Sequence, residues 1–426
     1  MDSSTAQPNI GMELTQNPIP EPKETKHFMK KQIFVSLAVI LFLVIGTIIA
    51  ILYGSGYRID FGNNHSIIQG TGLLVATSTP DGAQVFVNGH LTTATNNTIN
   101  LAPGDYNIKI YKDGYFPWEK KIKIENEVVS KAEAFLFPTT PKLEGITATG
   151  VLNPVIDPTM TKIAYVVASQ SARKNGIYVL DMANRSLITL QSASTQLTDD
   201  TTVNFDTASL AWSPDGQQLV ATIPAQLTTS KPTTYLLDAT TFNSNPQDVT
   251  ETLSSVDDSW QKLTRDKENS RLDTLKPSLK GFASSNFDIL SWSEDESKIL
   301  YVASNSATLP QIIKPAIIGA DSIPEVRNLE KGSVYVYDTK EDKNFKIEDN
   351  RDNKSISWFP DSKHLIVVED KKINIREYDG GNNTTIYAGP FVDGYVFPWP
   401  TADQIVVLTD LGNSSTLPNL YTVGLK

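Results

Sequence analysis

Residues 210–221 read LAWSPDGQQLVA, and this stretch decides the fold because the chain repeats its pattern. A second copy at residues 290–301 reads LSWSEDESKILY, and a third at residues 356–367 reads ISWFPDSKHLIV. In each copy a short apolar strand ends at a Trp, a polar turn reverses the chain, and a second apolar strand follows. A Trp side chain is large enough to fill the space between stacked sheets. The sequence therefore predicts a mainly β protein built from repeated hairpins.

Two weaker copies extend this repeat toward both ends of the region. Residues 155–165 carry Ile156 in the place of the Trp, and residues 396–406 carry Trp399 there. A further apolar strand follows each copy, and we predict a repeating unit of four strands, as in a propeller blade. Repetition of a small sheet at a fixed period is typical of propellers and related arrays.

The spacing of the copies predicts a propeller with insertions. Equivalent positions are separated by 56, 80, 66 and 41 residues, whereas a blade needs roughly 40–50 residues. The excess predicts insertions at about residues 245–281 and 307–328, the first with a short helix over residues 249–262. The WSPDG stretch at residues 212–216 resembles the β-propeller repeats of TolB-like proteins and WD-type relatives. This resemblance covers most of residues 142–426 and implies a β-propeller, with five blades favoured and six possible.

An apolar segment near the N-terminus predicts a single transmembrane helix over residues 32–53. Residues 33–53 contain no charge, and about 20 apolar residues cross a hydrocarbon core of roughly 30 Å as a helix. Several lysines precede the segment, which places the N-terminus in the cytoplasm and the following domains outside it. Residues 1–31 are expected to be a disordered cytoplasmic tail. A cleaved signal peptide is the alternative, but its apolar region would be shorter.

Turn signals and alternating strands after the helix predict a small β domain at residues 70–138, joined by a connector at residues 54–69. The turns read PDGA at residues 80–83, PGDY at residues 103–106 and GY at residues 114–115. This set resembles the PEGA domain, with Asp81 in the place of the usual Glu. The resemblance implies a small, non-catalytic antiparallel β-sandwich of the kind found outside the cytoplasm in bacterial envelope proteins.

Composition narrows the partners that this chain of 426 residues could have. Its formal net charge is −11 and it contains no Cys. The acidic balance argues against nucleic acid, because phosphate binding requires a basic patch. The lack of Cys excludes disulfides, thiol catalysis and thiolate metal sites. The predicted transmembrane helix and the resemblance to envelope modules imply the membrane and an envelope protein or polysaccharide as partners.

No set of residues in the sequence has the spacing of a catalytic or metal site. The four His residues, His27, His65, His90 and His364, lack the spacing of metal ligands, and we expect each on the surface. A G-x-S-x-G elbow and a Gly-rich phosphate loop are also missing from the sequence. The Asp residues of the repeat are expected to cap turns, and its Trp residues to fill the core. We therefore predict no enzyme activity, no cofactor and no metal.

Aromatic residues outside the repeat are the candidates for ligand contact. They are Tyr115, Phe116 and Trp118 at the tip of the sandwich and Trp260 in the long insertion. Local packing is the alternative for each of them. We favour a non-catalytic binding or scaffold protein, anchored by one helix in the bacterial cell membrane, that contacts an envelope polymer or protein. An envelope sensor or assembly factor is the first alternative, and an extracytoplasmic glycan or peptide hydrolase is the second.

Overall fold

The computed structural model describes residues 26–54, 58–60, 67–183, 194–225, 231–317, 323–352 and 354–426. The predictions made for residues 1–25, for His65 and for part of the connector lie outside these ranges. The chain divides into two compact units, residues 1–70 and residues 71–426.

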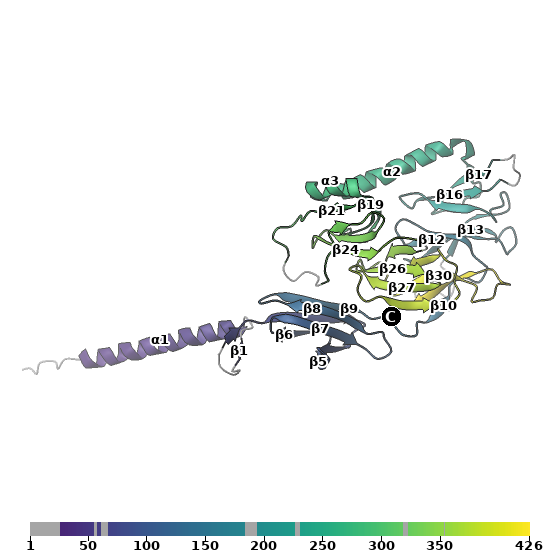
Figure 1. Ribbon diagram of the computed structural model, residues 1–426. Helices are drawn as coiled ribbons and strands as arrows, with labels where there is room; N and C mark the ends of the chain where they lie inside the picture. The colour runs from purple at the N-terminus through teal and green to yellow at the C-terminus, as the bar shows by residue number, and fades with distance from the viewer. Residues whose placement is uncertain are drawn as a thin grey trace, which may run out of the picture. The chain divides into compact units, whose positions relative to one another are not determined.

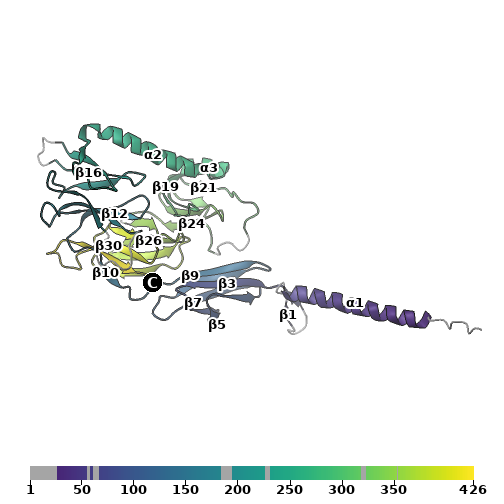
Figure 2. The ribbon, with the colours of Figure 1, turned by 180° about the vertical axis from the view of Figure 1, so that it is seen from behind.

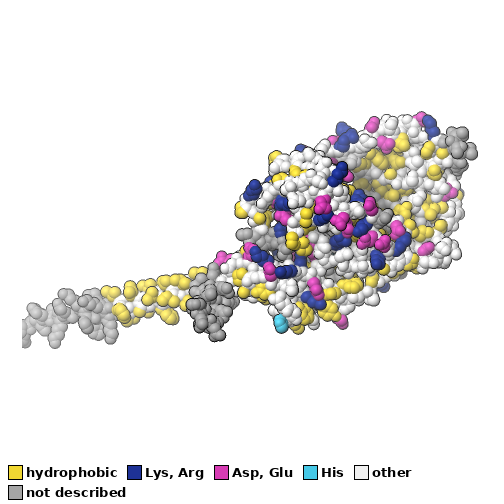
Figure 3. Space-filling view, in the orientation of Figure 1, with side chains coloured by type: hydrophobic (Ala, Val, Ile, Leu, Met, Phe, Trp, Pro, Cys, Tyr) yellow, Lys and Arg dark blue, Asp and Glu magenta, His cyan; other side chains and the backbone are white. Residues whose placement is uncertain are grey.

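The first unit contains one long helix, α1 (Lys26–Gly54). Its segment Ile33–Ile51 has a mean hydropathy of 3.0 and exposed side chains, and Figure 3 shows these as hydrophobic on the visible face. A helix of this length and composition can cross a membrane, and the prediction of an N-terminal apolar helix is confirmed. Residues 26–31 are helical and not disordered as predicted, because they contain no Gly or Pro to end the helix. A short antiparallel pair follows, formed by β1 (Arg58–Asp60) and β2 (Ile67–Gln69).

The second unit begins with a β-sandwich of two sheets. One sheet has the strand order β6-β3-β9 and the other has the order β5-β4-β7-β8. The strands are β3 (Gly72–Thr79), β4 (Gln84–Val87), β5 (His90–Ala94), β6 (Asn97–Leu101), β7 (Gly104–Tyr111), β8 (Trp118–Ile124) and β9 (Val129–Phe135). Alternate side chains point inward and form one core that includes Leu74, Val85, Ile108 and Ile122.

One strand pair departs from the predicted antiparallel sandwich. β3 and β9 run parallel, with Leu74 opposite Ser130 and Ala76 opposite Ala132. The chain leaves β8 in one sheet and enters the other sheet as β9, so β9 reaches β3 from a crossover and not from a hairpin. A period-two pattern reports which side chains are buried and carries no information on strand direction.

Five four-stranded sheets follow within the described residues, and they form the blades of a propeller. Blade 1 has β11 (Leu152–Ile156), β12 (Lys162–Val167), β13 (Gly176–Asp181) and β14 (Ser194–Asp199). Blade 2 has β15 (Ser209–Trp212), β16 (Gln218–Ile223), β17 (Thr233–Asp238) and β18 (Gln247–Asp248). Blade 3 has β19 (Phe287–Trp292), β20 (Lys298–Ala303), β23 (Val334–Asp338) and β24 (Lys343–Glu348). Blade 4 has β25 (Ser355–Trp358), β26 (His364–Glu369), β27 (Lys372–Glu377) and β28 (Thr384–Ala388).

Blade 5 ties the two ends of the propeller together. It combines β29 (Val396–Pro398), β30 (Gln404–Thr409) and β31 (Asn419–Gly424) with β10 (Leu143–Gly145). β10 pairs antiparallel with β31, so the first strand of the region completes the last sheet. In both ribbon views the strands β8 and β9 of the sandwich lie beside the strands of blades 4 and 5 (Figures 1 and 2).

The repeated turn has the structure that the sequence predicts. In blade 2 the Asp215 carboxylate accepts hydrogen bonds from the Ser213 hydroxyl at 2.6 Å and from the Gln217 amide at 3.1 Å. These bonds lower the pKa of Asp215, the hydroxyl contributing most. Gly216 has a φ of 69°, a left-handed conformation that suits Gly. The Asp is therefore a structural cap of the hairpin.

Two insertions interrupt the blades. Between blades 2 and 3 the chain forms η1 (Thr250–Thr252), α2 (Leu253–Asp273) and α3 (Pro277–Asn286). The predicted short helix thus extends to Asp273, because no Gly or Pro interrupts the polar sequence after residue 262. Within blade 3, β21 (Ala307–Thr308) pairs with β22 (Asn328–Leu329). Figure 1 shows α2 running along one side of the propeller, from blade 2 toward blade 3.

Candidate functional site

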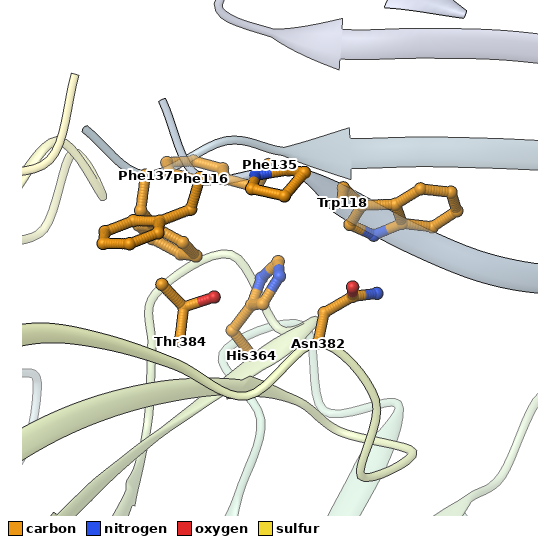
Figure 4. Close-up of a pocket in the computed structure, with 8 residues that line it drawn as sticks. Phe116, Trp118, Phe135, Phe137, His364, Asn382 and Thr384 are labelled. Carbon is orange, nitrogen blue, oxygen red and sulfur yellow. The ribbon is translucent and has the colours of Figure 1, made fainter. Parts of the chain in front are cut away.

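The boundary between the sandwich and the propeller is built from aromatic side chains. Phe135 and Phe137 lie 4.9 Å apart between ring centroids, and Phe135 meets Phe359 of blade 4 edge-on at 5.9 Å. Phe116 packs against the same cluster. Figure 4 shows Phe116, Phe135 and Phe137 on the sandwich side, facing His364, Asn382 and Thr384 of the propeller. The cavity between them has a volume of only about 10 Å³. The boundary therefore has the packing of a protein core.

His364 lies in the middle of this aromatic cluster and is 4% exposed. Its Nδ1 is 2.5 Å from an Asp361 carboxylate oxygen, and the rings of Phe135 and Phe137 pack on it edge-on. Burial lowers the pKa of His364, but the carboxylates of Asp361, Glu377 and Asp379 together outweigh burial and the net pKa is raised. The prediction of a surface His is wrong, because the sandwich covers a turn position that would be exposed in an isolated propeller.

A buried group of charges continues the boundary beside the aromatics. Lys120 of β8 pairs with Glu377 at 3.0 Å and with Asp379, whose side chain is fully buried. Glu377 also accepts hydrogen bonds from the Trp118 indole and from the Asn382 amide. Each charge therefore has a partner, as buried charges require.

The sequence of β8 carries a signal for this ion cluster. In β8 the inward positions are Trp118, Lys120, Ile122 and Ile124, so one Lys stands on the apolar face of the strand. A Lys in that place requires a buried carboxylate partner. Which acidic residue supplies it could not be read from the sequence, because Glu377 is more than 250 positions away.

A cleft of about 560 Å³ opens between the sandwich and blades 3 and 4. Its charged lining consists of Lys120, Lys123, Lys131, Glu133, Lys298, Asp338, Lys340, Glu341, Lys363 and Glu377. Several of these charges compensate one another: Lys298 is 3.6 Å from Asp338, and Lys363 pairs with Glu133 across the cleft. The cleft is therefore lined by both positive and negative side chains, which can donate and accept hydrogen bonds, and not by charges of one sign.

A second open groove, of about 410 Å³, lies between α2 and the repeated turn of blade 2. Its lining combines two indoles with polar side chains: Trp212, Pro214, Asp257, Trp260, Gln261, Thr264 and Arg265. Figure 3 shows a hollow with hydrophobic side chains beneath α2 on this side of the molecule. The volume is within the range of about 300–1,000 Å³ that small-ligand sites have.

The structure separates the predicted contact residues into two groups. Tyr115 packs against the sandwich core and forms a β-bridge with Pro138. Phe116 and Trp118 lie in the boundary with the propeller, and Trp118 is 4% exposed. Trp118 also lines the cleft between the domains, and Trp260 lines the groove below α2 together with Trp212, a residue that the sequence assigned to the core. The sandwich tip is thus covered by the propeller and is not open as predicted.

Among the residues that the structure describes, no three His, Asp or Glu side chains are grouped so that they could hold a metal ion.

Comparison with known proteins identifies one domain. Residues 71–136 match the PEGA domain model, so the chain contains a PEGA domain. No curated protein matches the sequence.

The propeller resembles solved propeller structures only distantly. A protein assigned as TolB from Agrobacterium tumefaciens is 14% identical with a TM-score of 0.21, covering 66% of this chain and 74% of that one. An acylaminoacyl peptidase from Pyrococcus horikoshii is 14% identical with a TM-score of 0.19, covering 65% and 38%. A prolyl endopeptidase is 11% identical with a TM-score of 0.23, covering 81% and 50%. The chain thus spans half or less of each peptidase.

Proposed function

We propose that this PEGA-domain chain is a non-catalytic binding protein of the bacterial cell envelope, held at the membrane by α1 with its other domains outside the cytoplasm. The observation that carries the proposal is the buried boundary between the sandwich and the propeller. Lys120, Glu377 and Asp379 join the two domains by paired charges that are almost fully enclosed. Two domains fixed in this way present one composite surface to a partner.

The membrane attachment in this proposal rests on α1. Its apolar segment is 19 residues long, and its side chains are apolar on all faces, which suits a lipid environment better than the surface of a soluble domain. An α1 helix that is not cleaved from the chain holds the second unit close to the membrane and to the polymers around it.

The chemistry of the two grooves supports recognition. In the cleft between the domains, lysines face carboxylates at ion-pair distance, as Lys298 and Asp338 do at 3.6 Å. In the groove below α2, Trp212 and Trp260 supply aromatic surface next to polar side chains. Both combinations are typical of sites that fix a ligand by complementary polar contacts and aromatic surface.

Binding and turnover can be measured together on the full chain in lipid nanodiscs. Purified envelope polysaccharide fractions and envelope protein fractions are passed over immobilised nanodiscs, and the retained and released material is analysed by mass spectrometry. The proposal predicts saturable retention of at least one fraction, with its chain length unchanged, and no retention by empty nanodiscs. Release of shortened chains above the blank, or retention of no fraction and of no envelope protein, would overturn it.

A further inference from the structure

We propose that the groove between α2 and blade 2 is a binding site for a neutral saccharide chain, which stacks on Trp212 and Trp260. This assignment rests on the proposed binding function and names one site and one ligand class for it. It follows from three features: the incomplete burial of Trp212, the position of Trp260 on α2, and the polar side chains at the edge of the groove.

Trp212 differs from the other Trp residues at equivalent positions of the repeat. Trp292, Trp358 and Trp399 are 6%, 2% and 3% exposed, whereas Trp212 is only partly buried and lines the groove. Four equivalent residues would be buried equally if all served only the core. The half-buried indole of Trp212 packs partly against the core of blades 1 and 2 and partly lines the groove.

A hydrogen bond fixes the plane of the Trp212 ring. Its indole N–H donates to the Val155 carbonyl of blade 1 at 3.1 Å. Because this N–H has a partner, it is not offered to the backbone carbonyl of a bound peptide. The part of the ring that lines the groove remains available, which favours a ligand that stacks over one that needs an indole donor.

The opposite wall of the groove is α2, which stands away from the propeller at this point. None of the 21 residues of α2 is buried. Near its C-terminal end the helix is attached to blade 3, where Glu268 accepts from the Trp292 indole at 3.3 Å and Arg271 pairs with Glu296 at 2.9 Å. Trp260 lies two helical turns before that attachment, so α2 covers Trp292 but leaves a hollow over Trp212.

The polar lining suits a sugar ring. Asp257, Gln261, Thr264 and Arg265 surround the two indoles, and together they supply both donors and acceptors for hydroxyl groups. A sugar ring has a C–H face that rests on the electron-rich face of an indole and a rim of hydroxyls that hydrogen-bond. Asp257 and Arg265 carry opposite charges, so this lining gives no net preference for a charged ligand.

The test uses the full chain in nanodiscs and three neutral probes: maltohexaose, cellohexaose and chitohexaose. Binding is followed by isothermal titration calorimetry and by the change in Trp fluorescence. We expect at least one hexasaccharide to bind with saturation, and Trp260→Ala to weaken that binding by at least about tenfold, the loss of roughly one stacking contact. Trp260→Phe, which keeps an aromatic face, should retain part of the affinity.

A control on the same helix separates loss of the site from loss of the fold. Leu263 is 46% exposed and does not line the groove, so Leu263→Ala should bind the hexasaccharide as the unsubstituted chain does. Trp212→Phe tests the second platform, and its thermal unfolding midpoint shows whether the blade is intact.

Three results would overturn the assignment. They are the absence of saturable binding to all three probes, binding that Trp260→Ala leaves unchanged, and binding of decaproline in the groove in preference to every hexasaccharide. If Trp260→Ala still retains envelope polysaccharide fully, the site is wrong while the proposed binding function stands. If no envelope polymer or protein is retained at all, the proposed function itself fails.

Discussion

Glu377 of blade 4 contacts two side chains of the sandwich, Lys120 and Trp118, and one of its own blade, Asn382. It pairs with Lys120 at 3.0 Å and accepts from the Trp118 indole and from Asn382. Burial of the Lys120 charge is favourable only while its carboxylate partners remain. The stability that this cluster gives the second unit therefore depends on each buried charge having its partner, more than on the strength of any single bond.

Removal of the Glu377 carboxylate should destabilise the second unit strongly. We expect Glu377→Ala to lower the free energy of unfolding by about 3 kcal/mol, because Lys120 and the Trp118 indole lose a buried partner. The measurement is chemical denaturation followed by Trp fluorescence. Asp105→Ala is the matched control. Asp105 pairs with Lys121, which follows Lys120 in β8 and points to the exposed side of that strand. Such a surface pair is worth about 0–1 kcal/mol, and an equal loss in both variants would contradict the account.

The His364–Asp361 pair should make stability depend on pH. Burial opposes the charged form of His364. The carboxylates of Asp361, Glu377 and Asp379 outweigh burial and raise the pKa of His364 above its ordinary value of 6.5. A raised pKa in the folded state stabilises the protein below pH 6.5, and this contribution is lost as the pH rises through the folded-state pKa. The thermal unfolding midpoint should therefore fall as the pH rises from 6.5 through the folded-state pKa of His364.

His364→Gln should flatten this part of the pH profile, whereas His90→Gln, at an exposed position, should leave it as it is. A profile of the unsubstituted chain that rises above pH 6.5 in step with His364 titration, measured by NMR, would refute the prediction.

At the scale of the elements, two glycines have opposite roles. Gly176 begins β13 with a φ of 122°, and an added Cβ would lie 2.1 Å from the Thr198 carbonyl oxygen of the neighbouring strand. Gly281 lies in α3, where an added Cβ meets nothing within 4 Å. Only the first glycine is required by the backbone around it.

Substitution by Ala should consequently have opposite effects at these two positions. We expect Gly176→Ala to cost at least about 2 kcal/mol through strain and the strand contact. Gly281→Ala should stabilise by about 0.5–1 kcal/mol, because Ala loses less conformational freedom in a helix. Equilibrium unfolding of both variants provides the comparison, and a stabilised Gly176→Ala chain would show that the described register of blade 1 is wrong.

The elements themselves were predictable where sequence pattern and packing agree. The hairpins around Trp212, Trp292 and Trp358 form as predicted, because alternation, turn residues and a large apolar side chain all favour the same structure. The parallel pairing of β9 and the full length of α2 were not predicted. Strand direction leaves no periodic signal, and a polar helix without buried residues has no apolar stripe to mark its end.

At the scale of the whole molecule, the topology of α1 can be tested because the chain contains no Cys. We expect a Cys placed at Phe242, a position that is 50% exposed, to react with a membrane-impermeant maleimide on intact cells. A Cys in the place of Ser4 should react only after the cells are opened. The reverse pattern would contradict the proposed orientation, and loss of the Ser4→Cys site from the mature chain would show that the segment is cleaved.

The candidate sites were predicted less well than the fold. Trp260 was identified because an isolated aromatic in a polar insertion is conspicuous. Trp118 was proposed as a ligand contact, and the structure shows in addition that its indole donates to Glu377 across a domain boundary. His364 was assigned to the surface because its burial depends on Phe135 and Phe137, which are separated from it by more than 200 positions. Contacts between domains leave no local pattern, so the boundary could not be derived from the sequence.

The central claim is that the sandwich and the propeller form one rigid body, and a distance distribution tests it most directly. Leu91 on the sandwich and Phe242 on the propeller are both exposed, and in a chain without Cys each can carry a spin label after replacement by Cys. Double electron–electron resonance on the full chain in nanodiscs should give one narrow distance distribution, which broadens when Glu377→Ala is added. A broad or bimodal distribution in the chain with Glu377 intact would contradict the account.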